Sequence, residues 1–204
     1  MLKGNTRFIP HILALLFCCC WCGNAVAAKE TEKKLVIPDY PCAKDQYNFA
    51  LMYEKAQFMS TVPEQRRQQM IKIAQCYQRV IDSFPQDLEF TSRALLQIGD
   101  CHAKISEPYQ AIRYYEVVLN SASEDEYLQA RALFSVAQMH DAKKEYEAAK
   151  HVYKEVMDRY GTSGNAAVRD LTKRASMLYF QVREQPTTKS KWSLRKLFGG
   201  NKSS

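Results

Sequence analysis

Three tyrosines recur in this chain at a regular spacing: Tyr77, Tyr115 and Tyr153 follow one another at intervals of 38 residues. Each is followed three and four residues later by an apolar pair: Val80 and Ile81, Val118 and Leu119, Val156 and Met157. Self-similarity with a period of roughly 20 to 50 residues is the signature of a repeat array, in which each unit buries its apolar face against its neighbours. The chain is therefore predicted to form a solenoid of similar units.

The repetition extends upstream of the tyrosines. Small and apolar residues keep one helical phase through two successive segments, in which Arg93, Leu95, Ile98, Gly99, His102 and Ala111 correspond to Arg131, Leu133, Val136, Ala137, His140 and Ala149. This phase predicts that each unit is a hairpin of two helices. The first helices are expected at 88–104 and 127–143, and the second helices at 108–121 and 146–160.

Less regular segments flank these two hairpins. Residues 64–84 are predicted to form a second helix that carries Tyr77 and stops before Pro85. Its first helix is expected at about 46–59. At the other end, 165–182 continues the pattern of the first helices, which predicts a final unpaired helix that caps the array.

The two regular segments resemble the tetratricopeptide repeat (TPR). In that family a small residue on the first helix lets the second helix pack closely, an alanine follows, and an aromatic residue closes the contact to the next repeat. Gly99, Ala111 and Tyr115 occupy these positions in one segment, and Ala137, Ala149 and Tyr153 occupy them in the next. The resemblance implies an all-α fold, a right-handed α-solenoid of about three TPR hairpins plus a C-terminal capping helix, over residues 45–183.

Two short runs look like a particular subtype of this family. They are Val-Ile-Asp-Ser-Phe-Pro, ending at Pro85, and Leu-Gln-Ile-Gly-Asp-Cys-His, which begins at Leu96. Both are similar to the repeats of BamD-like and Tol-Pal coordinator proteins of the bacterial envelope, over about residues 45–182. The resemblance implies a role in outer-membrane assembly or envelope maintenance.

The start of the chain predicts export. Lys3 and Arg7 precede an apolar run from Ile9 to Trp21, and Ala25-Val26-Ala27 supplies the small residues that a signal peptidase reads. We expect a signal peptide over 1–27, an extended segment over 28–44, and a periplasmic or envelope-associated protein that is membrane-peripheral if its tail docks. The alternatives are a retained membrane anchor, although the run is shorter than the roughly 20 residues that span a bilayer, and lipidation at Cys20.

Three cysteines follow the leader. Cys76 and Cys101 fall at small apolar positions of predicted helices, which favours packed thiols, whereas Cys42 precedes the first helix. An exported protein permits disulfides. A disulfide from Cys42 to one of the other two is the alternative, and the sequence does not give the pairing.

The basic charge lies at the two ends of the chain. The formal net charge is +7, of which the leader supplies two and residues 185–204 supply five with no acid, so the repeat region is neutral. The high pI therefore does not indicate nucleic-acid binding by the solenoid.

Residues 184–204 are expected to form a basic flexible tail. Basic residues beside aromatic and aliphatic ones suit an anionic membrane surface or a partner, and a disordered basic end is the alternative. The residues concerned are Lys191, Trp192, Leu194, Arg195, Lys196, Leu197 and Phe198.

No pattern in the chain predicts catalysis. His102 and His140 share one repeat position, which is typical of recurring packing, and there is no His-Glu-x-x-His motif or pair of Cys-x-x-Cys motifs. No glycine-rich phosphate loop or nucleophile elbow is present. We therefore expect no catalytic residue, no metal and no cofactor.

The TPR resemblance implies a binding groove lined by the first helices. The residues that it places there are Arg93, Leu96, Gln97, Asp100, Arg131, Phe134, Ser135, Gln138, Asp141 and Arg169. The three arginines form a column at repeat spacing that would suit acidic side chains or a peptide carboxylate. Solvated arginines, or arginines paired with acids such as Glu89 and Asp170, are the alternative.

Our leading hypothesis is an exported, non-catalytic adaptor that binds a protein or peptide in this groove. One alternative is a structural subunit of an envelope complex, which would use the repeat ends or the opposite face. The other is a membrane-surface protein that docks through its tail.

Overall fold

The structure is a computed structural model that describes residues 35–121 and 123–183. The predicted signal peptide, most of the extended segment and the basic tail lie outside these residues. The described residues from Ile37 onward belong to one compact unit. Within the described ranges, no helix combines the length and the apolar character that crossing a bilayer requires.

The described residues contain seven α-helices and no strand, so the predicted all-α class is confirmed. Their bounds lie within about three residues of the predicted ones: α1 Ala43–Ala56, α2 Pro63–Ser83, α3 Leu88–Lys104, α4 Pro108–Leu119, α5 Glu126–Ala142, α6 Tyr146–Tyr160 and α7 Ala166–Arg183.

One boundary needs correction. The first helix ends at Ala56, whereas the sequence pattern carried it to Met59. Gln57 is already extended. Two β-branched residues and Pro63 follow shortly, and the residue before a proline is disfavoured in helical conformation. The segment 57–62 is therefore a loop.

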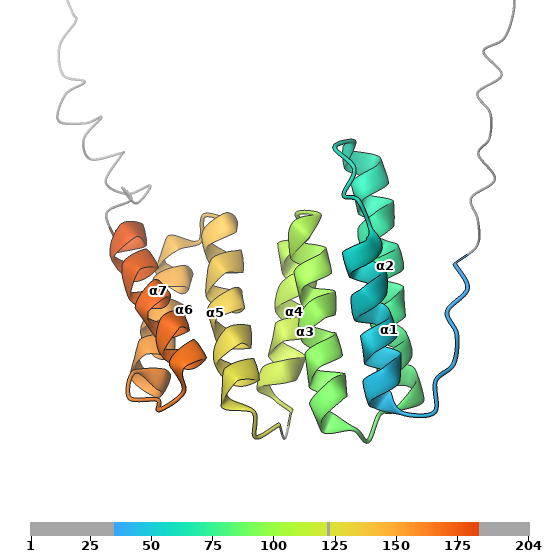
Figure 1. Cartoon of the computed structure of the whole chain (residues 1–204). Helices are drawn as coiled ribbons and strands as arrows, with labels where there is room; N and C mark the ends of the chain where they lie inside the picture. Colours follow the sequence, from blue (N-terminus) through green and yellow to red (C-terminus); the bar gives the residue numbers. More distant parts are fainter. Residues whose placement is uncertain (1–34, 122, 184–204) are drawn as a thin grey trace, which may run out of the picture. The chain divides into compact units, whose positions relative to one another are not determined.

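Each helix packs against the next one along the chain (Figure 1). Among the described residues, α1, α3, α5 and α7 also approach one another in succession, whereas α2, α4 and α6 make no close backbone approach to another even-numbered helix. The odd-numbered helices are therefore the more closely spaced layer and form the inner side of the stack.

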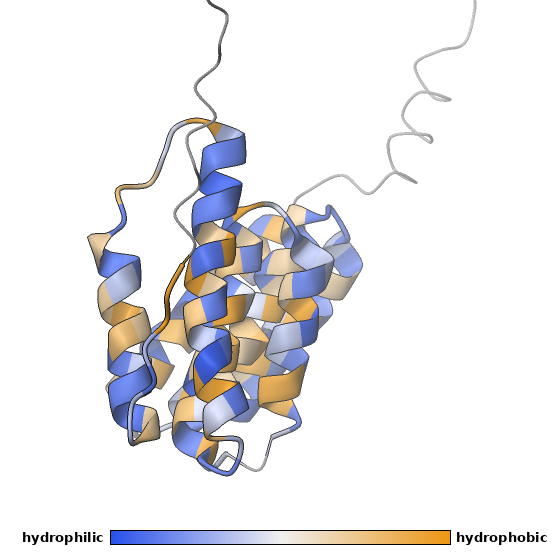
Figure 2. Ribbon diagram, turned by 90° about the vertical axis from the view of Figure 1, so that its right-hand side faces the viewer, coloured by the Kyte–Doolittle hydropathy of each residue, from blue (hydrophilic) through white to orange (hydrophobic). Residues whose placement is uncertain are grey.

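One buried tyrosine lies on the second helix of each hairpin. Tyr77, Tyr115 and Tyr153 are almost fully inaccessible to solvent, and the Val that follows each of them by three residues is also buried. Figure 2 shows the hydrophobic residues gathered between the helices and the hydrophilic ones on their outer faces. The sequence period thus corresponds to a repeated packing position.

The turns repeat as well. Asp87 and Asp125, which are 38 residues apart, cap α3 and α5 by accepting a hydrogen bond from the backbone N–H three residues later, each at 3.1 Å. Ser106 and Lys144, at the same spacing, both have positive φ, 60° and 62°, where the chain leaves α3 and α5. The two hairpins therefore share their connections as well as their core.

The segment before α1 is attached to the helices. The amide of Gln46, which is fully buried, donates from Nε2 to the carbonyl of Pro38 at 3.1 Å and accepts from the backbone N–H of Tyr40 at 3.0 Å. Arg79 on α2 pairs with Asp39. These contacts hold residues 38–40 against α1 and α2.

The three described cysteines are free thiols. Cys76 and Cys101 are buried, as the packed-thiol interpretation predicted. Cys42 is exposed, and its Sγ donates to Asp45 Oδ2 at 3.2 Å. The alternative of a disulfide from Cys42 to Cys76 or Cys101 does not hold in this structure.

Candidate partner-binding face

The inner layer carries a hollow of about 270 Å³, which we call the central hollow. It lies where α1, α3 and α5 meet, so the close spacing of the odd-numbered helices positions it. Its lining combines two arginines, a carboxylate, an amide, two tyrosines and two leucines. The residues are Tyr47, Arg93, Leu96, Gln97, Asp125, Tyr127, Leu128 and Arg131.

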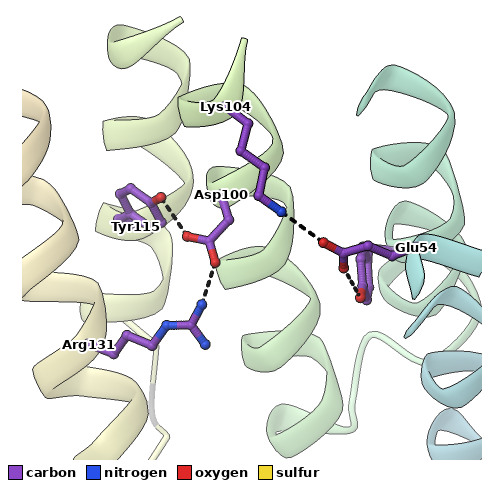
Figure 3. Close-up of polar contacts among 6 residues, drawn as sticks. Glu54, Asp100, Lys104, Tyr115 and Arg131 are labelled. Atoms are coloured by element: carbon purple, nitrogen blue, oxygen red, sulfur yellow. Dashed lines mark hydrogen bonds and ion pairs between the residues drawn. The ribbon is translucent and has the colours of Figure 1, made fainter. Parts of the chain in front are cut away.

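Asp100 connects three helices beside this hollow. Its Oδ1 accepts a hydrogen bond from the hydroxyl of Tyr115 on α4 at 2.8 Å, and its Oδ2 pairs with Arg131 on α5 (Figure 3). Burial raises the pKa of Tyr115, and the Asp100 carboxylate raises it further. Asp100 therefore holds the second helix of its own hairpin and the first helix of the next hairpin at the same time.

Glu54 performs the same function one hairpin earlier. Its Oε2 accepts from the hydroxyl of Tyr77 at 2.8 Å, and its Oε1 pairs with Nζ of Lys104 on α3 at 2.9 Å (Figure 3). Burial alone would lower the pKa of Lys104, but the hydrogen bond and charge of Glu54 more than offset it, so this pKa is raised. In both places a tyrosine donates a hydrogen bond to an acid, and the acid pairs with a base on the next hairpin. We call this set of contacts between successive hairpins the relay.

The relay ends at the third tyrosine. The position equivalent to Asp100 is Gln138, which offers no carboxylate to the arginine equivalent to Arg131. That arginine, Arg169, donates instead to the backbone carbonyls of Ser163 and Gly164, at 3.2 and 2.6 Å.

The predicted arginine column is therefore already partnered. Arg93 pairs with Glu89 at 2.9 Å, lies 4.0 Å from Asp125, and places its guanidinium over the Phe90 ring. Arg93 and Arg131 are each paired with an acid, as in the alternative interpretation. The acid that binds Arg131 is Asp100. For Arg169 the partners are carbonyls and not Asp170.

The other predicted groove residues divide by burial. Leu96 is buried but reaches the central hollow, and Gln97 is half-buried on its wall. Phe134 and Ser135 are buried away from the hollow's lining; the Phe134 ring contacts Tyr153 and is covered by the guanidinium of Arg174. Phe134 belongs to the core that α5 shares with α6 and α7, whereas Ser135 lies near Tyr115 of α4.

Gln138 and Asp141 lie farther along α5 and are half-buried. Neither contributes to the lining of the central hollow. Partial burial raises the pKa of the Asp141 carboxyl. The predicted set thus falls into a group of four that line the hollow, namely Arg93, Leu96, Gln97 and Arg131, with Asp100 beside them, and a separate group toward the C-terminal end.

Sequence reasoning missed four residues of the hollow. Tyr47 lies on α1, and Asp125, Tyr127 and Leu128 lie at the start of α5. The equivalent position of Tyr127 one period earlier is Glu89, so the repeat pattern gave no reason to select it. An aromatic residue two positions after an N-capping aspartate was the available signal.

The two histidines at the shared repeat position stabilise the turns between the two helices of a hairpin. His102 Nδ1 contacts Glu107 Oε2 at 2.7 Å, and His140 Nδ1 contacts Glu145 Oε2 at the same distance. The His102 hydrogen bond is the main cause that lowers the pKa of Glu107. In residues 35–121 and 123–183, no three His, Cys, Asp or Glu side chains come together as a metal site.

Comparison with known proteins adds no assignment. No protein-family model matches the chain, and no curated protein matches it.

Proposed function

We propose that this protein is an exported, non-catalytic TPR adaptor that binds a protein or peptide partner at the central hollow. In this proposal the helices form a right-handed α-solenoid of about three TPR hairpins, with α7 as the cap. The signal peptide predicted over 1–27 is the reason to place the protein in the cell envelope, where the adaptor would serve outer-membrane assembly or envelope maintenance.

The observation that carries the proposal is the hollow itself. It is concave, it lies on the closely spaced helix layer, and four of the residues expected from the TPR resemblance line it. Its mixture of charged, amide and aromatic groups matches the composition of peptide-binding sites, in which a few polar groups fix orientation and apolar surface supplies affinity.

The charges in the hollow favour a particular partner chemistry. Arg93 and Arg131 face acids that already neutralise them, so the hollow has no uncompensated positive column. Gln97 and the two tyrosines supply donors and acceptors without a net charge. We therefore expect an extended peptide with mixed polar and aromatic side chains, and not a strongly acidic one.

A site-specific photocrosslinking experiment tests this proposal. A benzoylphenylalanine at Gln97, on the hollow, is compared with one at Gln110, which is exposed on α4. If the protein is an adaptor, the benzoylphenylalanine at position 97 should crosslink to one specific envelope protein. The benzoylphenylalanine at position 110 should not. Replacing Gln97 by Trp should fill the hollow and abolish pull-down of that protein, whereas Gln110→Trp should not.

A second function has its own supporting observation at the end of the stack. The outer face of α1 and the segment before it form a hollow of about 470 Å³ whose lining is mainly apolar, and Met52 in it is 70% exposed. The lining residues are Tyr40, Asp45, Asn48, Phe49, Met52, Tyr53 and Ala56. Such a surface favours a structural subunit that continues the stack through its end. A complex that survives Gln97→Trp but is lost on Met52→Glu would support this alternative and contradict the adaptor proposal.

A further inference from the structure

The loop between α1 and α2, residues 57–62, exposes three apolar side chains, and we call it the apolar tip. Phe58 is 95% exposed, Val62 is 47% exposed and Met59 is 44% exposed. Scattered single apolar residues on a surface are normal, but three within five positions form a patch.

The apolar tip is held in place by hydrogen bonds. Gln69 on α2 donates from Nε2 to the carbonyl of Phe58 and accepts at Oε1 from the backbone N–H of Ser60, both at 2.9 Å. Arg66 Nε donates to the carbonyl of Ser60 at 3.0 Å. Because these bonds fix the backbone on both sides of Met59, the exposure of the apolar side chains is built into the loop.

The tip also projects from the stack. α2, with 21 residues, is the longest of the described helices, and residues 61–68 are all exposed. Figure 1 shows the α1–α2 connection standing beyond the neighbouring α3–α4 connection at the same edge. A flat or fluid surface could therefore meet the tip without contact to the remaining helices.

The charges around the tip are mainly basic. Lys55, Arg66 and Arg67 flank it together with two acids, Glu54 and Glu64. Arg67 is engaged by Glu107 at 2.6 Å, and Glu54 is engaged by Lys104 at 2.9 Å. The exposed charges that remain are Lys55, Glu64 and Arg66, whose Nε stays bonded to the Ser60 carbonyl.

The described part of α7 also ends at this edge. The odd-numbered helices run in one direction, so α7 ends at Arg183 on the edge that carries the apolar tip (Figure 1). From there the sequence continues into residues 185–204, with five basic residues and no acid.

We infer that the apolar tip docks this edge of the protein on an anionic phospholipid bilayer. Phe58, Met59 and Val62 enter the boundary between headgroups and acyl chains, while Lys55 and Arg66 contact lipid phosphates. A membrane accommodates a convex tip without a complementary pocket, and its negative surface matches the basic residues. The central hollow lies on another face, so this inference extends the proposed function and does not depend on it.

Photocrosslinking from the tip tests this inference on the full-length chain. Benzoylphenylalanine replaces Phe58, and in the control it replaces Leu88, an apolar residue that is 46% exposed at the opposite edge. Each protein is illuminated on phosphatidylcholine vesicles with and without phosphatidylglycerol. We expect lipid adducts from position 58 and not from position 88, with a yield that rises with phosphatidylglycerol.

A charge variant tests whether the basic residues contribute to the contact with lipid. Lys55→Gln should lower the adduct yield from position 58 roughly fivefold on anionic vesicles, whereas Lys44→Gln, at the other end of α1, should not change it. Vesicle-bound protein that gives no lipid adduct at position 58, or equal yields on neutral and anionic vesicles, overturns the inference. Capture of a protein in place of lipid, when vesicles prepared from envelope membranes are used, also overturns it and assigns the tip to a protein partner.

Discussion

Gly99 lies against the ring of Tyr115 so closely that a Cβ at residue 99 would come within 2.5 Å of Tyr115 Cε1. Tyr115 is 1% exposed and its hydroxyl is bound to Asp100, so the ring has no room to move away. The close approach of α3 and α4 therefore requires a residue without a side chain at position 99.

The variant Gly99→Ala should consequently destabilise the protein. Overpacking typically costs about 1–3 kcal/mol, and the higher helix propensity of alanine offsets up to about 1 kcal/mol of it. The free energy of unfolding is measured by urea denaturation. Gly164→Ala is the matched control, because a Cβ there meets no atom within 4 Å; equal effects of the two variants would contradict the packing argument.

The relay through Asp100 predicts coupling between α3 and α5. Replacing Asp100 by Ala removes the partner of both Tyr115 and Arg131, and should cost about 1–3 kcal/mol of unfolding free energy. A double-mutant cycle of Asp100→Ala with Arg131→Ala should give a coupling energy of about 1 kcal/mol. The pair Gln138→Ala with Arg169→Ala serves as the control, since these residues occupy the same repeat positions without an ion pair, and additive effects are expected there.

The regular hairpins could be predicted from the sequence because one residue of each period is chemically distinctive. A tyrosine that must be buried at 38-residue intervals fixes the phase of both helices in the hairpin. The helices over 88–104 and 146–160 were therefore located without error. α1 was less regular, and its end was placed three residues too late.

The candidate site was only partly predictable, because the partner of a charged side chain depends on which helices meet. Arg93, Arg131 and Arg169 share one position in the repeat, yet they bind a glutamate, an aspartate and two carbonyls respectively. Tyr47 reaches the hollow from α1 through packing between non-adjacent helices, which a comparison of two neighbouring repeats cannot reveal. The apolar tip was assigned partly to a helix, which concealed its exposure.

The burial of the thiols predicts their order of reaction. In the folded protein, iodoacetamide should modify Cys42 well before Cys76 and Cys101, which lie in the core and have pKa values raised by burial to about 11 and about 12. Peptide mapping by mass spectrometry follows each site separately, and a sample in urea shows that all three react once unfolded. Modification of Cys76 as fast as Cys42 would mean that α2 opens readily from the stack.

The same two thiols predict a loss of stability at alkaline pH. In the unfolded chain a thiol loses its proton near pH 9, whereas Cys76 and Cys101 keep theirs in the folded protein until about pH 11 and about pH 12. The unfolded state then binds fewer protons, so stability is complete below pH 9 and falls as the pH rises above it. Each thiol contributes a slope of up to about 1.4 kcal/mol per pH unit. Urea midpoints between pH 8 and 10.5 should therefore fall less steeply for Cys76→Ala than for the wild type, and parallel slopes would contradict this cause.

The interrupted relay can be restored. Asp100 and Arg131 are 31 residues apart, as are Gln138 and Arg169, so Gln138→Asp would place a carboxylate where Arg169 can reach it. Because position 138 is half-buried, Arg169 is exposed and Arg169 must release two carbonyls, the expected gain in unfolding free energy is about 0.5 kcal/mol. The same substitution in an Arg169→Gln background should give no gain. A gain in unfolding free energy that persists without Arg169 would show that the gain does not arise from this ion pair. The two hairpin junctions would then be equivalent in their packing but not in their charge pairing.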